Sequence, residues 1–378
     1  MKKTLSHAAI IIGAALIVMA ILLPAFLVPK LKSIPLDTVS TTITDTREGS
    51  LLDSGALAKN EPVKGRENDP RCEGEDLPVH CFIGDQTPLR SNRHVHTEEP
   101  SDGDVVTLEV GTTIIRDDRE EPANLVNATV DRITLDRYNS YPVDEPISTT
   151  QYHNPSQPGA DQLQEFTRPG IQYQFPMGAE KKSYPYYDVV GLVEQPIDFI
   201  DEEEQDGATV YKYEMVIEPV NLYESFKAHQ TANGRELTQA DKDYMASLRL
   251  TFPANKWGLE GDDDVTMDRY YANVRTVRVE PTTGMIVNGT EHIFQFYARD
   301  PEEAKRIAGP DRAKEERERN RTAMDFVAQW SEETKANQLN QALDSKSKLS
   351  TFGTVAPIIL GILGLILVVV GIIGIRRH

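Results

Sequence analysis

The stretch YYANVRTVRVE (270–280), PTTG (281–284) and MIVNGTEHIFQFYA (285–298) decides the expected fold. Both long runs have the composition of β-strands. Pro281 opens the short segment between them and Gly284 closes it, which is the chemistry that a tight turn requires. The stretch therefore predicts an antiparallel β-hairpin.

Several other runs resemble strands, because they are rich in Thr, Val and Ile. They are SIPLDTVSTTITDT (33–46), DVVTLEVGTTII (104–115), VNATVDRITLDRY (126–138) and ATVYKYEMVIEPV (208–220). Residues 47–103 are polar and rich in Gly and Pro, so we expect an irregular excursion there. Residues 139–170 predict a long ordered loop, and residues 221–250 hold a shorter helical candidate.

The segment 310–349 predicts a long charged helix. After Pro310 it contains no Gly or Pro, and its charges alternate in sign. Its apolar residues are spaced as a helical stripe. They are Met324, Val327, Trp330, Leu339, Ala342 and Leu343. Such a helix serves either as a stalk or folds back along the domain with its stripe buried.

The two ends of the chain are uncharged and apolar over residues 8–28 and 352–375. Each run is long enough to cross a hydrocarbon core of about 30 Å as a helix. For the first run the alternative is a cleaved signal peptide, but the run is longer than usual for one. Small residues in both runs favour packing of the spans on each other or on another membrane protein.

The predicted fold class is therefore α+β: a mainly antiparallel β domain outside the cytoplasm, with a long C-terminal helix, flanked by two transmembrane helices. The short ends lie in the cytoplasm under this interpretation, and the β-rich domain in the periplasm of an inner-membrane protein. The corresponding segments are 1–7 and 376–378 for the ends and 29–351 for the domain.

Charge and cysteine usage support this placement. Four of the 40 Lys and Arg residues lie beyond the apolar runs, so the segment between them holds 36 against 59 acids, a net charge of −23. Such a surface repels nucleic acid, and we exclude that partner. Cys72 and Cys81 enclose a short loop and predict a disulfide in an oxidising space. The alternative is two free cytosolic thiols.

No catalytic signature is present. The sequence has no HExxH, GxSxG, P-loop or GxGxxG motif, so we expect no enzyme and no cofactor. His80, His94 and His96 lie near the cysteines, but zinc needs about four convergent ligands. We therefore expect no metal site, and loop histidines exposed to solvent.

A cationic and aromatic spot, FPMGAEKKSYPYYD (175–188), interrupts the acidic chain. Tyrosines bind sugar rings and lysines bind phosphate, so the spot is a candidate ligand site. The alternative is structural, with aromatic rings in the core and lysines paired to nearby acids. The candidate residues are Phe175, Lys181, Lys182, Tyr184, Tyr186 and Tyr187.

At this spot the chain resembles the actinobacterial envelope family labelled "porin PorA family", whose pattern is an aromatic-Pro pair, a small turn and EKKxYPYxD. The matching residues are Phe175, Pro176, Glu180, Lys181, Lys182, Tyr184, Pro185, Tyr186 and Asp188. The two-span layout, the hairpin at 273–292 and the segment ETKANQLNQA (333–342) resemble the family too.

The resemblance implies two different functions. The family label implies a porin, whereas some relatives resemble periplasmic factors in mycomembrane lipid transport and polar growth that work with large lipid exporters. A porin barrel needs many strands with an outward apolar band, and this sequence shows few. We therefore expect a non-enzymatic factor that binds or passes trehalose monomycolate or lipoglycan. The alternatives are a scaffold for lipid exporters or cell-wall enzymes and, less favoured, a porin or an envelope hydrolase. No oligomeric state is indicated.

Overall fold

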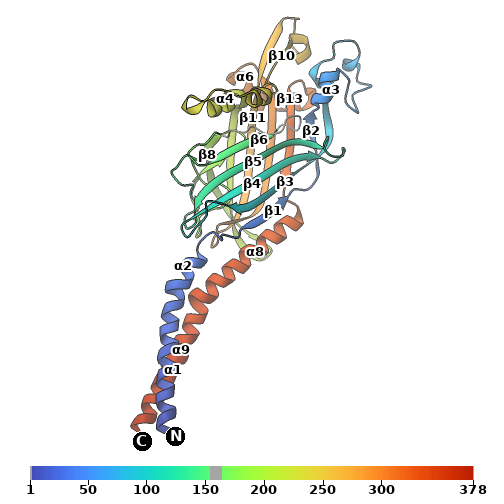
Figure 1. Ribbon diagram of the computed structural model, residues 1–378. Coiled ribbons are helices and arrows are strands. Elements are labelled where there is room, and N and C mark those ends of the chain that lie inside the picture. The colour runs from blue at the N-terminus through green and yellow to red at the C-terminus, as the bar shows by residue number, and fades with distance from the viewer. Residues whose placement is uncertain (1, 154–163, 378) are drawn as a thin grey trace.

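The computed structural model describes residues 2–153 and 164–377. It has two parts (Figure 1): a β-rich body and a pair of long helices that leave the body together, with both chain termini at their far end. The helical segments are α1 (Lys2–Leu22), α2 (Val28–Leu31), α3 (Ser54–Lys59), α4 (Leu222–Gln230), α5 (Gln239–Met245), α6 (Pro301–Ala308), α7 (Arg312–Glu318), α8 (Glu332–Ser350) and α9 (Ala356–Arg376).

One antiparallel sheet builds the body. Its strands are β1 (Val39–Ile43), β2 (Arg47–Leu52), β3 (Ile83–Glu98), β4 (Val105–Arg116), β5 (Leu125–Asp136), β6 (Thr149–His153), β7 (Tyr184–Asp188), β8 (Val193–Gln205), β9 (Ala208–Asn221), β10 (Arg249–Pro253), β11 (Asp264–Glu280), β12 (Met285–Ala298) and β13 (Thr322–Gln329). Their order is β6-β5-β4-β3-β2-β13-β12-β11-β9-β8-β7, with β1 on β3 and β10 on β11.

The predicted hairpin is confirmed and lies near the middle of the sheet. β11 and β12 pair from Asp268↔Ala298 to Glu280↔Met285. Gly284 closes the turn with φ 71°, and a Cβ there would lie 2.1 Å from the carbonyl oxygen of Phe175. Only glycine suits that position, because its backbone is left-handed and another chain segment touches it.

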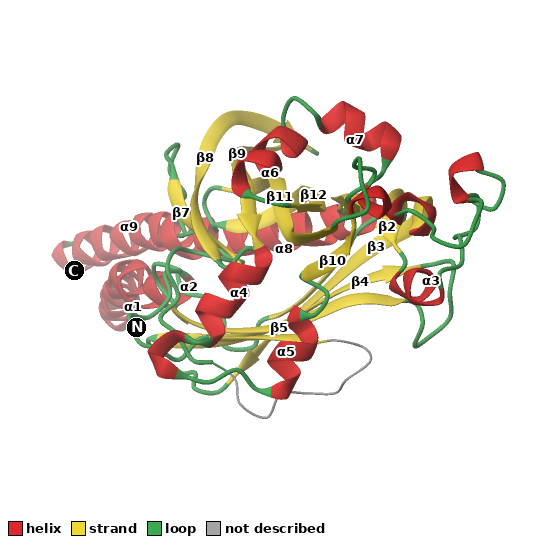
Figure 2. Cartoon of the chain, turned by 90° about the horizontal axis from the view of Figure 1, so that it is seen from above, coloured by secondary structure: helices red, strands yellow, loops and turns green. Residues whose placement is uncertain are grey.

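The sheet curls around a single main core. Figure 2 looks down on the body and shows β8, β9, β11 and β12 on one side, β3, β4 and β5 on the other, and α4 and α5 across the opening. Side chains from opposite sides meet inside, among them Leu89 of β3, Ile114 of β4 and Tyr213 of β9. Phe226 of α4 and Met245 of α5 join the same cluster. The curled sheet is thus filled with side chains and covered at the end distant from α1 and α9.

The expected helix over 310–349 is wrong in its first half. α7 stops at Arg319, whose φ of 50° is left-handed, and residues 322–329 form strand β13 between β12 and β2. In β13 burial alternates, so Met324 and Phe326 point into the core whereas Val327 points away. The apolar residues of this segment fit the two-residue repeat of a strand, which the structure adopts, although they also fit the 3.6-residue repeat of a helix. The long helix begins at Glu332, and Leu339 and Ala342 are buried against the body.

The irregular excursion expected at 47–103 is also wrong in part, because β2 and β3 lie within it. β3 extends over 16 residues and pairs with β1, β2 and β4. Its polar residues alternate with apolar ones too weakly to reveal a strand in advance. The irregular part is residues 53–82, which contain α3 and the cysteine loop. Within residues 139–170, the expected loop contains the short strand β6, and positions 154–163 lie outside the described residues.

Candidate functional site

The structure places the four aromatic residues of the predicted spot inside the body. Phe175, Tyr184, Tyr186 and Tyr187 are all buried. The ring of Phe175 lies 5.4 Å from that of Tyr184, edge to face, and 4.8 Å from that of Tyr213. These aromatic residues therefore contribute to core packing.

The two lysines of the spot lie on the outside. Lys181 forms an ion pair with Glu202 at 2.9 Å, and Lys182 pairs with Glu180 at 2.8 Å. These partners raise the pKa of both ammonium groups. Lys182 Nζ lies 5.3 Å from the ring centroid of Tyr184, but that ring is buried and both ammonium groups are already paired with acids. This arrangement matches the structural alternative, with rings in the core and lysines paired to nearby acids. A ligand-binding role for the spot stays a prediction.

Residues 166–171 join the two edges of the curled sheet, and we call them the closing segment. Phe166 exchanges backbone hydrogen bonds with Ser148 beside β6, at 3.0 and 3.2 Å. Ile171 donates to Pro185 O of β7 and accepts from Tyr187 N. A sheet with two free edges is thus closed into a barrel-like body by a segment that is not itself a strand.

Arg168 of the closing segment enters the interior. Its guanidinium donates to Asp131 of β5 at 3.1 Å, and both side chains are buried. Asp131 also accepts hydrogen bonds from Thr150 and Tyr173, each at 2.7 Å. The guanidinium lies 4.4 Å from the ring centroid of Tyr187. This buried ion pair ties the closing segment to the sheet.

A second charged group lies inside the same body. Arg275 of β11 donates to Asp188 at 2.9 Å and to Glu291 at 3.0 Å. Tyr271 donates to Asp188 as well. Burial raises the pKa of Glu291, but Arg275 and Arg93 outweigh this effect and lower it to about 2. Glu291 is therefore ionised, and Arg275 and Arg93 compensate its charge.

The sequence analysis missed both inner groups. Charged residues in a strand read as solvent-facing, and the strand period does not show which face is buried. The one available signal was Asp188, which belongs to the family motif and proves to accept hydrogen bonds from Arg275, Tyr271 and the backbone of Val190 and Gly191.

A cavity of about 360 Å³ lies where the body meets the helices. Leu31 and Leu349 form its helical side, and Ile286 and Trp330 part of its wall on the body. Arg93 also lines it and pairs with Glu291 at 3.6 Å, so the cavity adjoins the inner charged group.

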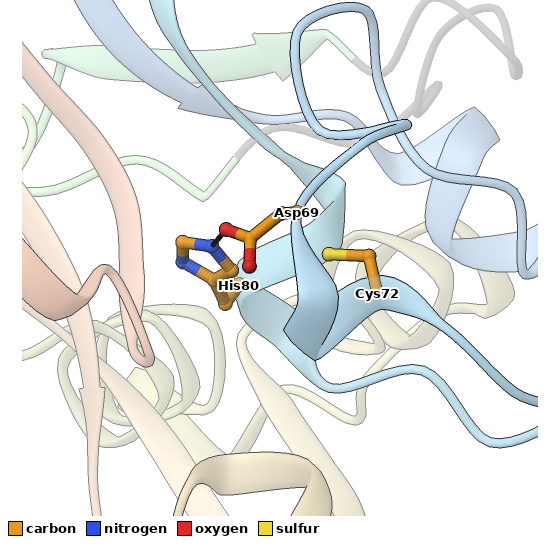
Figure 3. A group of neighbouring side chains, drawn as sticks. All are labelled: Asp69, Cys72 and His80. Atoms are coloured by element: carbon orange, nitrogen blue, oxygen red, sulfur yellow. Dashed lines mark hydrogen bonds and ion pairs between the residues drawn. The ribbon is translucent and has the colours of Figure 1, made fainter.

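The predicted disulfide is confirmed: Cys72 and Cys81 are bonded. Figure 3 shows Asp69, Cys72 and His80 close together, the arrangement of a possible metal site. His80 is buried, so the expectation of a solvent-exposed loop histidine is wrong for this residue. Its Nε2 lies 2.8 Å from Asp69 Oδ2 and 2.7 Å from a guanidinium nitrogen of Arg71. Since the sulfur is in the disulfide, the group serves here to brace the loop.

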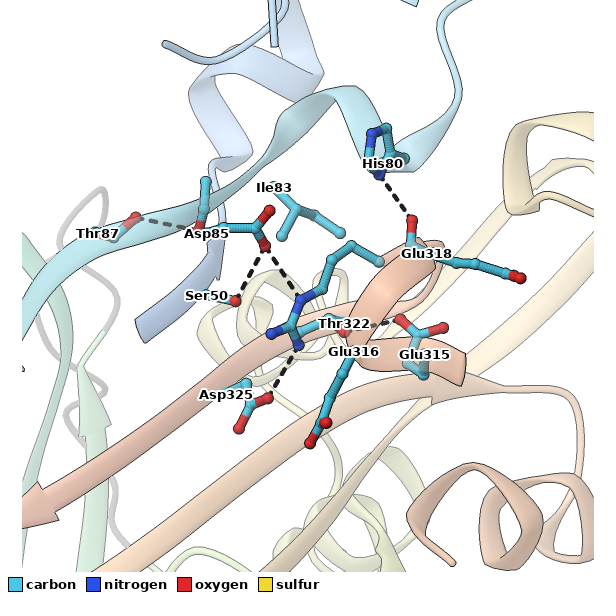
Figure 4. Close-up of polar contacts among 12 residues, drawn as sticks. Ser50, His80, Ile83, Asp85, Thr87, Glu315, Glu316, Glu318, Thr322 and Asp325 are labelled. Atoms are coloured by element: carbon cyan, nitrogen blue, oxygen red, sulfur yellow. Dashed lines mark hydrogen bonds and ion pairs between the residues drawn. The ribbon is translucent and has the colours of Figure 1, made fainter. Parts of the chain in front are cut away.

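The disulfide loop is attached to the C-terminal half of the chain through polar contacts (Figure 4). His80 Nδ1 donates to the carbonyl oxygen of Glu318 at 2.7 Å. The neighbouring Arg319 donates to Asp85 of β3 at 3.1 Å and to Asp325 of β13 at 2.9 Å. The end of α7 thus connects two strands that are far apart in the sequence.

The two apolar helices pack on each other. Thr4–Leu31 and the helical run Glu332–Arg376 are each long and apolar enough to span a membrane. Glycines lie at their contact: a Cβ on Gly371 would meet Ser6 O at 2.7 Å, and one on Gly374 would meet Ser6 Oγ at 2.4 Å. Both runs contain a π-helical turn, at Leu23–Leu27 and Thr351–Val355.

Comparison with known proteins places the chain in one family from end to end. The family model described as Porin PorA matches residues 5–373. A protein named Porin PorA from Corynebacterium amycolatum is 61% identical over 369 residues, which cover 96% of each chain. A second protein of that name, from Corynebacterium resistens, is 47% identical over 387 residues, which cover 96% of this chain and 94% of the relative.

These names point to a porin channel and overturn the expectation of a factor for glycolipid binding or passage. They give no support to mycomembrane lipid transport or polar growth. The expectation was wrong because it tested only whether the sheet forms the pore, although helices also line channels. The family match and the two apolar helices indicate a membrane protein of the cell envelope. The chain belongs to the Porin PorA family.

Proposed function

We propose that this protein is a subunit of a porin-type channel that passes small hydrophilic solutes through an envelope membrane, without a catalytic step. The observation that carries the proposal is the 61% identity, over 96% of both chains, to a protein named Porin PorA. Identity at that level over the full length supports a shared activity.

The geometry favours a pore lined by helices of several copies. The crossing elements are helical, and their backbone groups are satisfied internally, as a bilayer requires. Gly13 and Gly364 bring α1 and α9 into backbone contact, so there is no room for water between the two helices of one copy. A conducting path then lies between neighbouring helix pairs.

The charge of the body favours cations. The segment between the spans carries 59 acids against 36 Lys and Arg, the 40 of the whole chain less the four beyond the spans. Acidic surfaces at the mouth of a channel concentrate cations and repel anions. We expect cation preference that weakens as salt screens the surface.

We further propose that the body lies outside the cytoplasmic membrane and that both termini lie in the cytoplasm. Two spans put the termini on one side, and the Cys72–Cys81 disulfide suits an oxidising space. Protease added to wall-stripped cells should digest the body. A body that resists protease until the cells are lysed contradicts this orientation.

Planar lipid bilayers test the channel. Purified full-length protein should produce stepwise conductance, and a KCl gradient should give a reversal potential of the sign expected for K⁺ permeation. Gly361→Ala serves as a matched control for Gly364→Ala. A Cβ on Gly361 would lie 3.8 Å from its nearest neighbour, Ala20 Cβ, whereas a Cβ on Gly364 would lie 2.7 Å from the backbone oxygen of Gly13. Gly364→Ala should reduce conductance, whereas Gly361→Ala should retain it. Absence of conductance from folded wild-type protein refutes the function.

A further inference from the structure

A second cavity lies between α3, the loop that follows it, the start of β3 and the turn after β4. Its volume is about 920 Å³. Figure 1 shows this region at the end of the body that is distant from the two apolar helices. The size suits a small hydrophilic molecule, because ligand sites in proteins measure roughly 300–1,000 Å³.

The cavity is rich in basic side chains, although the body as a whole is strongly acidic. Its basic lining residues are Lys59, Lys64, Arg66, Arg116 and Arg119, and its acidic ones are Asp53, Glu61, Asp85 and Asp118. The lining thus carries one net positive charge, against −23 for the segment between the spans. This local reversal of sign singles out the cavity.

Most of the lining acids are already bound by arginine. Asp53 is buried and accepts hydrogen bonds from both Arg116 and Arg119. Arg116 also binds Asp118 in a bidentate manner, through two hydrogen bonds of 2.7 Å each. Asp85 pairs with Arg66 from the loop. These pairs leave little negative charge to repel an anion.

Two lysines remain without an ion pair. Lys59 ends α3 and Lys64 lies in the following loop, both are exposed, and neither forms a salt bridge to any other described residue. Glu67, three residues from Lys64, accepts the backbone N–H of Gly65 at 2.6 Å and forms no ion pair with that lysine. Among the lining acids, Glu61 alone has no ion pair within the described ranges, so the free charge of the cavity is positive.

We propose that this cavity binds a small hydrophilic solute through an oxyanion, with the ammonium groups of Lys59 and Lys64 as its direct partners. The paired arginines fix the cavity wall, and the lysines supply the uncommitted donors. Charge-assisted hydrogen bonds to phosphate or carboxylate oxygens are the strongest that such donors make. The site stands on its own geometry and does not depend on channel activity.

Titration calorimetry on the detergent-solubilised full chain tests the proposal. The probes are glucose 6-phosphate, glucose, inorganic phosphate and citrate at low salt. Glucose 6-phosphate should bind and glucose should not, and the other two probes distinguish phosphate from carboxylate recognition. Lys59→Ala/Lys64→Ala should weaken binding of glucose 6-phosphate by about tenfold or more.

Lys227→Ala/Lys242→Ala is the matched control, since it removes two exposed lysines of α4 and α5 that do not line the cavity. It should leave the affinity within about twofold of wild type, because surface charges far from a site act only through screened fields. Thermal melts confirm that both variants are folded. The proposal is overturned if no anionic probe binds more tightly than glucose, if the lysine pair at the cavity proves dispensable, or if both double variants lose affinity equally.

Discussion

Gly13 of α1 and Gly364 of α9 touch through their backbones. A Cβ built on Gly13 would lie 2.6 Å from the carbonyl oxygen of Gly364, and one built on Gly364 would lie 2.7 Å from that of Gly13. Such reciprocal contact is possible only where both residues lack a side chain. It joins residues 351 positions apart in the chain and holds α1 and α9 together as one helix pair.

The helix contact gives the first prediction. Gly364→Ala should lower the stability of the α1–α9 helix pair by about 1–3 kcal/mol, because the added methyl group overpacks a backbone contact. Gly361→Ala should change it little, since its Cβ meets Ala20 at 3.8 Å. Unfolding of each variant in mixed micelles with increasing SDS measures the stability of the helix pair. Equal unfolding midpoints for the two variants would show that this pair does not depend on the close contact of Gly13 with Gly364.

The second prediction concerns the junction of α8 with the body. Lys346 Nζ lies 2.9 Å from Glu280 Oε1, and Glu280 is buried. Lys346→Ala should cost about 1–2 kcal/mol in urea unfolding, a value reduced because the lysine is itself partly exposed. Lys348 lies two residues further along the same helix and pairs with exposed Asp344. Lys348→Ala should therefore lower the free energy of unfolding by less than about 0.5 kcal/mol.

Low pH provides the internal check on this pair. Burial raises the pKa of Glu280, but Lys346 and Thr283 outweigh burial, so the net pKa is lowered. A lowered pKa stabilises the fold above the ordinary value of about 4.3, and this contribution disappears as the pH falls through the folded value. The gap between wild type and Lys346→Ala should therefore be full at pH 7 and shrink below about pH 4. A gap that is independent of pH would contradict the ion pair as its cause.

The third prediction concerns the closing segment. Arg168→Met leaves Asp131 buried without its cation and should destabilise the body by about 3–5 kcal/mol. The double variant Arg168→Met/Asp131→Leu should lose less than the single variant, since no uncompensated charge remains. Urea unfolding followed by circular dichroism compares the two. A double variant that is no more stable than the single variant would exclude charge compensation as the role of Arg168.

The fourth prediction is a pH dependence. Burial, with smaller contributions from Arg168 and Arg235, lowers the pKa of His229 to about 4. The unfolded chain takes up this proton near pH 6.5 and the folded chain only near pH 4, so stability falls as the pH drops between these values. The loss from this residue should be about 2–3 kcal/mol.

His229→Gln should remove that part of the slope, measured as unfolding free energy from pH 7 to pH 4.5. The pKa of His80 is lowered by burial as well, but it acts equally in both proteins and cancels in the difference. Parallel curves for wild type and variant would show that His229 does not titrate differently in the folded and unfolded chain.

The elements that local patterns define were predictable. The runs at 104–115, 126–138 and 208–220 correspond to β4, β5 and β9, and the hairpin at 270–298 to β11 and β12. Turn chemistry and β-branched composition act over a few residues, so they are visible in one sequence. Residues 322–329 were mistaken for helix because Met324, Val327 and Trp330 also fit a helical spacing.

The candidate site could not be predicted in the same way. Phe175 and Tyr184 looked like a binding platform beside Lys181, but they face the core and the lysine faces solvent. Arg168 and Arg275, which no sequence pattern singled out, are buried. In each case the deciding fact is which way a side chain points, and this depends on strands that are distant in the sequence.

The sequence by itself determined the two apolar helices, the acidic β-rich body between them, and the disulfide, because length, charge and short-range chemistry suffice for these features. Only the tertiary structure decided that the sheet curls and is closed by residues 166–171, that charged pairs lie inside it, and that a cationic cavity forms at its far end. These features depend on contacts between segments separated by many residues, and such contacts are set by the packing of the whole chain and not by any one stretch of it.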